Sequence, residues 1–167
     1  MLAVVSDSSP LIYFTRLGLF SLLKQLHEVV LIPPAVWTEI TVGGANLEEA
    51  RNLHQAAADG WLQVKSPVVR LEDISAQNDL GRGEIEAIAL AKELGAILLT
   101  DDADARAFAI CMGVKVVGTL GLIVRAKSER YISEVKPLLD QLRLSNFRMS
   151  ESLYHHALKE AGEIPSS

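Results

Sequence analysis

The sequence predicts an α/β fold of three layers, in which a doubly wound, central parallel sheet lies between helices, and three observations support it. Short apolar runs alternate along the chain with stretches of helical periodicity. These runs are continuous and rich in β-branched residues, as expected of strands that are buried on both faces. Two of the runs end in aspartate, and open α/β sheets place polar groups where their strands end. Right-handed crossovers bring such strand ends to one edge of the sheet.

The first half of the chain supplies three predicted strands and three helices. The strands are expected at residues 2–5, 29–32 and 61–64, and the helices at 11–26, 35–42 and 46–58. Ser9 is expected to cap the first helix, and Pro10 fits its first turn. Gly18 interrupts that helix, and Pro34 can start the second one. The third strand is short and half-exposed by its pattern.

The second half continues the alternation after a predicted loop at residues 66–80. Strands are expected at 96–100 and 114–117, and helices at 84–94, 103–112, 120–127, 133–144 and 151–161. Glycines close several of these helices, and Ser150 caps the last one. No linker separates two domains, so residues 1–167 are expected to form one domain. Its C-terminal helices, about 131–162, pack on that domain or serve in dimerisation.

Composition is that of a globular chain. Hydrophobic residues make up 49% of the 167 residues and charged residues 22%, and the formal net charge of −5 argues against a broad basic face for nucleic acid. No apolar run reaches the roughly 18–20 residues that span a bilayer, and the start lacks a signal peptide, so a cytoplasmic location is expected. The lone Cys111 follows an apolar helical pattern and is expected to pack. The four histidines show no metal-ligand spacing.

Three aspartates follow predicted strands. Asp7 ends the first run, and Asp101 and Asp102 follow the strand at 96–100. One acid can simply cap the next helix, whereas a doublet exceeds what a cap requires. For Asp7, a turn cap and a catalytic role stay open on this stretch alone.

Two glutamates on predicted helices point toward the same edge. Glu39 follows the strand at 29–32 and shares a helix face with Val36 and Val42, although a solvated glutamate is the alternative. Glu84 lies in the first turn of its helix, where a carboxylate also favours the helix dipole. The segment 81–83, Gly-Arg-Gly, allows close approach of another group. Glu86 and Glu93 face elsewhere and look ordinary.

Crowded carboxylates require a cation. Without one, they would repel and some would protonate. Oxygen-rich clusters suit Mg²⁺ or Mn²⁺, which can activate water and stabilise a phosphoryl group, so phosphodiester hydrolysis is the expected chemistry. Ser8 or Thr100 can hydrogen-bond a ligand or a phosphate. Arg82 and Arg106 can contact a substrate phosphate or pair with the acids.

These motifs resemble a PIN domain over about residues 2–125. The resemblance rests on Asp-Ser-Ser at 7–9, a glutamate after the second strand, Gly-x-Gly-Glu at 81–84 and Leu-Leu-Thr-Asp-Asp at 98–102. It places the four family acids on Asp7, Glu39, Glu84 and Asp102, with Asp101 beside them as an auxiliary ligand or orienting group. Ser8, Ser9 and Glu84 depart conservatively from the usual family residues. The segments 100–106 and 118–122 resemble a poorly characterised prokaryotic PIN-like subfamily.

The resemblance implies a Mg²⁺- or Mn²⁺-dependent ribonuclease, and many relatives are toxins of toxin–antitoxin pairs. It also implies RNA as substrate, homodimerisation and, for a toxin, an antitoxin partner. The alternative is a non-catalytic PIN-like module that binds nucleic acid or protein. Receiver, dehalogenase-type and dinucleotide-binding folds fit less well, because the acidic pair, the second aspartate and the Gly-x-Gly-x-x-Gly motif that they need after the first strand are absent.

Overall fold

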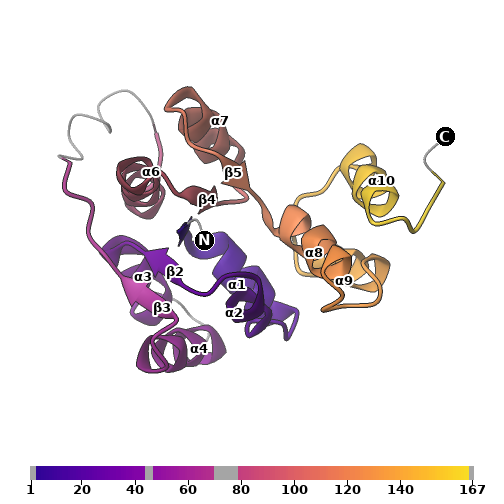
Figure 1. Cartoon of the computed structure of the whole chain (residues 1–167), viewed down its shortest axis with the longest axis horizontal. Coiled ribbons are helices and arrows are strands. Elements are labelled where there is room, and N and C mark those ends of the chain that lie inside the picture. Colours follow the sequence, from indigo (N-terminus) through magenta and orange to yellow (C-terminus); the bar gives the residue numbers. More distant parts are fainter. Residues whose placement is uncertain (1–2, 44–46, 70–78, 166–167) are drawn as a thin grey trace.

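The computed structural model describes residues 3–43, 47–69 and 79–165. Within these ranges a parallel sheet with the order β3-β2-β1-β4-β5 runs through the molecule (Figure 1). The strands are β1 Val4–Ser6, β2 Val30–Ile32, β3 Leu62–Val64, β4 Ile97–Leu99 and β5 Val116–Val117. The first strand is central and pairs with β4, with Val5 opposite Leu98. The prediction of an α/β fold with a parallel sheet is therefore confirmed.

Helices cover both faces of the sheet. Those before β4 are α1 Ser8–Arg16, α2 Leu22–Leu26, α3 Pro34–Thr41, α4 Leu47–Ala58 and α6 Arg82–Leu94. Those after it are α7 Ala103–Cys111, α8 Thr119–Ser128, α9 Lys136–Leu144 and α10 Glu151–Glu160. Because successive strand residues point to opposite faces, Val4 and Val5 enter two different cores. One core lies under α6 and α7, and the other is shared by α1, α2, α3, α4, α8, α9 and α10.

Most element boundaries agree with the sequence to within two or three residues. Gly18 has a φ of +70°, the left-handed conformation that glycine adopts most easily, and it separates α1 from α2 as expected. The expected cap of the first helix was wrong, because Asp7 is the N-cap residue of α1 and Ser9 lies within the helix. Residues 44–46 and 70–78, which include part of the expected loop and one helix start, lie outside the described ranges.

Three expectations for single residues were wrong. Glu86 is buried, accepts a hydrogen bond from Ala35 N–H at 2.9 Å and therefore caps the N-terminus of α3, so it is not an ordinary surface acid. Val42 is 78% exposed and does not share a buried face with Glu39, because α3 ends at Thr41. Cys111 is exposed at the end of α7.

The last helix packs against the rest of the chain. Tyr154, Ala157 and Leu158 of α10 are buried in the same core as α8 and α9, whereas Leu153 is 42% exposed. The Tyr154 hydroxyl donates to Asp140 Oδ1 at 2.7 Å and joins α10 to α9. None of the helices in the described ranges is long and apolar enough to cross a membrane.

Candidate active site

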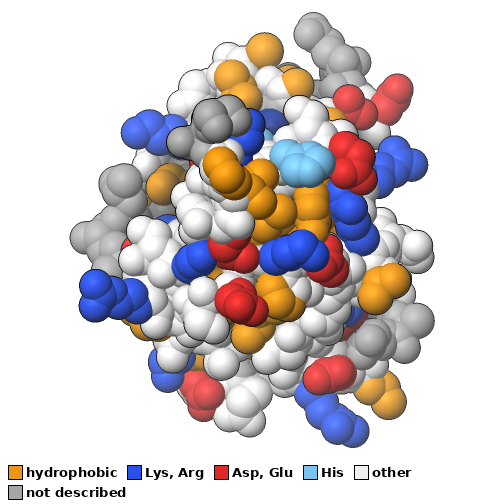
Figure 2. Space-filling view, turned by 90° about the vertical axis from the view of Figure 1, so that its right-hand side faces the viewer, with side chains coloured by type: hydrophobic (Ala, Val, Ile, Leu, Met, Phe, Trp, Pro, Cys, Tyr) orange, Lys and Arg blue, Asp and Glu red, His pale blue; other side chains and the backbone are white. Residues whose placement is uncertain are grey.

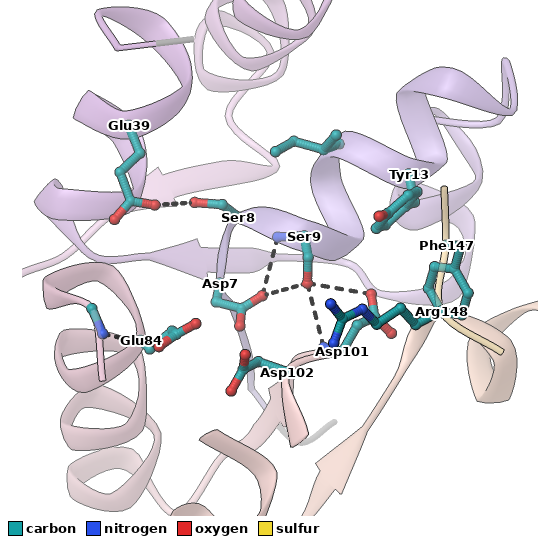
Figure 3. A pocket seen from close by; sticks show the side chains of 12 residues that line it. Asp7, Ser8, Ser9, Tyr13, Glu39, Glu84, Asp101, Asp102, Phe147 and Arg148 are labelled. Carbon is teal, nitrogen blue, oxygen red and sulfur yellow. Dashed lines mark hydrogen bonds between the residues drawn. The ribbon is translucent and has the colours of Figure 1, made fainter. Parts of the chain in front are cut away.

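A pocket of about 340 Å³ lies at the edge where β1 and β4 end, and all five predicted acids line it (Figure 3). They come from four regions of the chain: the N-cap of α1, the helix α3, the helix α6 and the segment that follows β4. The described lining residues are Asp7, Ser8, Ser9, Ile12, Tyr13, Glu39, Gly81, Glu84, Asp101, Asp102, Phe147 and Arg148. The fold therefore brings together the carboxylates that the sequence placed at this edge.

Asp7 is the most deeply buried acid of the pocket, with 4% of its surface exposed. Its Oδ1 accepts from the Ser9 backbone N–H at 3.2 Å, which is the N-cap hydrogen bond of α1. Its Oδ2 accepts from the Thr100 hydroxyl at the end of β4. The Asp7 side chain therefore both caps α1 and lines the pocket, because β1 ends where α1 begins.

Asp101 and Asp102 accept hydrogen bonds from the starts of two different helices. Asp102 is the N-cap residue of α7 and accepts from Ala105 N–H at 2.8 Å, as expected for one member of the doublet. Asp101 accepts from the backbone N–H and the hydroxyl of Thr119, at 2.7 and 2.6 Å, and so holds the start of α8. The Ser9 hydroxyl lies 3.2 Å from Asp7 Oδ1 and 3.3 Å from Asp101 Oδ2, so it bridges the two acids.

Glu84 and Glu39 line the pocket from α6 and α3, and each accepts a hydrogen bond there. Glu84 Oε2 accepts from Gly81 N–H at 3.0 Å, which fixes its side chain in the first turn of α6. Glu39 Oε2 accepts from the Ser8 hydroxyl at 2.6 Å. A Cβ atom at Gly83 would lie 2.5 Å from Glu39 Oε1, so a residue without a side chain lets α6 approach this carboxylate. The close approach expected at segment 81–83 is thus directed at Glu39.

The surroundings of three carboxyl groups in the pocket disfavour their ionised forms. Burial raises the pKa of Asp7 from 3.8 to about 7, against hydrogen bonds from Thr100 and Ser9, and the charges of Asp101 and Glu84 raise it further. Burial also raises the pKa of Asp101, although hydrogen bonds from Thr119 oppose it. Burial, and then the charges of Asp102 and Glu39, raise the pKa of Glu84.

The chemistry of the donors fits a divalent cation. Carboxylate oxygens are the ligands that Mg²⁺ and Mn²⁺ prefer, and a cation would compensate the charge that raises the pKa values of these acids. Among the residues that the structure describes, no group of three or more His, Cys, Asp or Glu side chains is arranged to hold an ion.

Two arginines predicted near the site lie outside the pocket. Arg82 pairs with Glu86 at 3.0 Å and its side chain is 79% exposed, because it lies on the opposite side of the first turn of α6 from Glu84. Arg106 and Asp101 both approach Gly118, which leaves space for them: a Cβ at Gly118 would lie 2.8 Å from Arg106 Nη2 and 3.0 Å from Asp101 Oδ1. The positive charge of Arg106 lowers the pKa of Asp101.

Some residues that line the carboxylate pocket were not predicted as site residues from the sequence. Ser9 was assigned only a capping role, although its place two residues after Asp7 could have signalled a site residue. Tyr13, Phe147 and Arg148 complete the rim, and the rings of Tyr13 and Phe147 meet edge to face with centroids 4.9 Å apart. Phe147 and Arg148 belong to the connection between α9 and α10, and no motif marks that connection in the sequence.

Comparison with known proteins identifies one family. The model of the family DUF3368, described as a PIN domain, matches residues 3–163. Among solved structures, the chain is similar to a PilT N-terminus domain protein from the hyperthermophilic archaeon Sulfolobus solfataricus P2. That likeness has 22% identity, covers 75% of this chain and 93% of the other, and gives a TM-score of 0.47. No curated protein matches the chain.

Proposed function

Because the chain belongs to the PIN domain family, we propose that its carboxylate pocket is the active centre of a ribonuclease that depends on Mg²⁺ or Mn²⁺. The observation that supports this most is the convergence of Asp7, Glu39, Glu84, Asp101 and Asp102 on one pocket, with a raised pKa at the most buried acid. A set of acids that merely capped helices would not need to share a cavity.

In this proposal Asp7, Glu39, Glu84 and Asp102 hold the divalent cation, and Asp101 is an auxiliary ligand or orienting group. When bound, such an ion stabilises charge on a phosphoryl group and lowers the pKa of water. Thr100 and Ser9 fix the Asp7 carboxylate from two directions, and Ser8 fixes Glu39. Their hydroxyls keep the acids oriented, so that less side-chain freedom is lost when a cation and substrate bind.

The direct test is cleavage of a fluorescently labelled RNA by the purified chain in Mn²⁺, in Mg²⁺ and in excess EDTA. We expect cleavage with either ion and none above background in EDTA. Intact RNA under all three conditions would contradict the enzymatic proposal. RNA binding without cleavage would instead fit the non-catalytic module that is the alternative.

A second prediction concerns Gly83→Ala. The added Cβ displaces the exposed Glu39 carboxylate toward solvent and away from the Ser8 hydroxyl, while alanine suits a helix better than glycine by about 1 kcal/mol. We expect cleavage to fall by about tenfold or more, with a free energy of unfolding equal to or above that of wild type. Both are measured side by side, by the RNA assay and by urea titration.

The matched control for Gly83→Ala is the same change in a Glu39→Gln background. If Gly83 acts through Glu39, the double variant loses no more activity than Glu39→Gln alone. A wild-type rate in Gly83→Ala would contradict the prediction, because cleavage would then not depend on the position of Glu39 against Gly83.

Three finer proposals follow from the family. Many PIN domains are toxins of toxin–antitoxin pairs, and we propose a cytoplasmic homodimer that is held inactive by an antitoxin in that setting. A solution mass by light scattering tests the dimer. An antitoxin encoded beside this chain would be identified by co-purification and by inhibition of the RNA cleavage.

A further inference from the structure

A second cavity of about 570 Å³ adjoins the carboxylate pocket and shares Asp101, Phe147 and Arg148 with it. It runs between the start of α8, the strand β5 and the inner side of α10. Figure 2 shows the side of the molecule that carries α10, where apolar side chains gather near the centre with basic, acidic and histidine side chains around them. We call this cavity the α8–α10 groove.

The walls of the α8–α10 groove combine a basic rim with an apolar floor. Arg106 and Arg148 supply positive charge next to Asp101, whereas His156 and Glu160 line the side formed by α10 and pair with each other at 3.2 Å. The apolar side chains that line the groove, called its floor here, include Val117, Leu120, Val124 and Leu153. In the described part of the chain, the guanidinium of neither arginine has a hydrogen bond or an ion pair, although the protein is acidic overall. Two unpaired guanidinium groups at the mouth of an apolar groove suit an anionic ligand that has an apolar body.

The position of Arg148 is fixed by its neighbours. Phe147 packs edge to face on Tyr13 of α1, and its N–H donates to the Leu142 carbonyl at 3.1 Å. Two residues later, Ser150 caps α10 by accepting from Leu153 N–H at 3.0 Å. The backbone is therefore held on both sides of Arg148, which lines the carboxylate pocket (Figure 3) and also the groove.

We propose that the α8–α10 groove is a nucleotide subsite for a single-stranded nucleic acid whose backbone crosses Arg148 from the carboxylate pocket. Arg148 and Arg106 each bind a phosphate of that strand, and a nucleobase lies on the apolar floor against Leu153. Continuity with the carboxylate pocket and the charge of the rim favour this occupant. This inference deepens the proposed function and rests on it, because the strand is the one cleaved in the adjoining pocket.

The groove requires an unpaired strand. A base held in a duplex cannot leave its stack to reach the apolar floor without the cost of unpairing. We therefore expect single-stranded RNA to bind at least tenfold more tightly than the same sequence in a duplex. Single-stranded DNA offers the same phosphates and bases, so its binding tests whether the subsite needs a 2′-hydroxyl group.

The test measures fluorescence anisotropy of a labelled single-stranded RNA at several salt concentrations. The Asp7→Asn background keeps the strand intact during the titration. The double change Arg106→Gln with Arg148→Gln is expected to weaken binding tenfold or more. It should also make the slope of log K against log salt less negative by about 1.4, because each lost phosphate contact accounts for about 0.7. The control variant, Lys92→Gln, removes an exposed charge on α6 away from the groove.

A matched pair of leucines tests the floor. Leu153 is 42% exposed and lines the groove, whereas Leu144 is 86% exposed and lies outside it. Leu153→Glu is expected to weaken RNA binding tenfold, and Leu144→Glu is expected to leave it unchanged, with thermal unfolding midpoints recorded for both. Equal affinities for strand and duplex, or an unchanged affinity and salt slope in the double arginine variant, would overturn the proposal. Because these are binding readouts, they decide the subsite even if wild type fails to cleave RNA.

Discussion

Asp7→Asn is expected to reduce metal-dependent RNA cleavage by about 100-fold or more while the fold stays intact. Asparagine keeps the shape of the side chain, and its Oδ1 can still accept the Ser9 N–H that caps α1. It lacks the negative charge that a divalent cation requires at the most buried position of the pocket. The measurement is the initial rate of cleavage in saturating Mn²⁺, for wild type and variant together.

The matched control for this loss is Asp59→Asn, because Asp59 is an exposed aspartate in the turn after α4. It should cleave RNA at the wild-type rate. A fully active Asp7→Asn protein would remove Asp7 from the site, whatever the other acids do.

The second large effect is on the stability of the metal-free protein, where Asp7 should make folding less favourable as the pH rises. Its pKa is about 7 in the folded protein and 3.8 when unfolded, so the folded state binds the proton more tightly. This group therefore contributes stability that is complete below about pH 4 and is lost as pH rises through about 7. The loss reaches about 3–4 kcal/mol by pH 8.

Titration of His27 changes the free energy of unfolding with pH in the opposite direction. The contribution of Asp7 must therefore be measured as a difference between wild type and Asp7→Asn. Burial lowers the pKa of His27 to about 4, and the folded protein gains stability from this group as the pH rises from about 4 to 6.5. Subtracting the free energy of unfolding of wild type from that of Asp7→Asn cancels the contribution of His27. We expect this difference to be small near pH 4 and to grow steadily to pH 8, where the variant is the more stable protein.

Urea titrations in EDTA at several pH values measure that difference. Adding Mn²⁺ at pH 8 should stabilise wild type and leave Asp7→Asn nearly unchanged, because a ligand that binds only the folded state raises its stability. A difference that stays constant across this pH range would mean that Asp7 is not held in an unfavourable charged state.

The positions of Asp7, Asp101 and Asp102 could be predicted from the sequence, because each directly follows a buried strand. In a parallel sheet the ends of neighbouring strands share an edge, so the chain order alone brings these acids together. Glu39 and Glu84 were predictable in outline, since each lies on the helix that follows a strand or loop of that edge. The resemblance to a PIN domain is confirmed by the family match.

The sequence could not reveal contacts made between elements far apart in the chain. From the pattern of its own helix, Glu86 was expected to be an ordinary surface acid. In the folded protein its carboxylate accepts a hydrogen bond from the backbone N–H of Ala35, in the first turn of α3. Arg148 was missed because its position depends on the ring contact of Phe147 with Tyr13, and no periodicity encodes such a contact. Arg82 was placed by nearness in sequence to Glu84, although neighbours on a helix face different directions.

The central claim is that this pocket binds the divalent ion of a nuclease, and anomalous X-ray scattering from crystals soaked in Mn²⁺ tests it most directly. The account expects an anomalous peak within coordination distance of Asp7, Glu84 and Asp102, and no such peak in crystals of Asp7→Asn. An empty pocket in crystals of a protein that cleaves RNA in Mn²⁺, with a peak elsewhere, would contradict it.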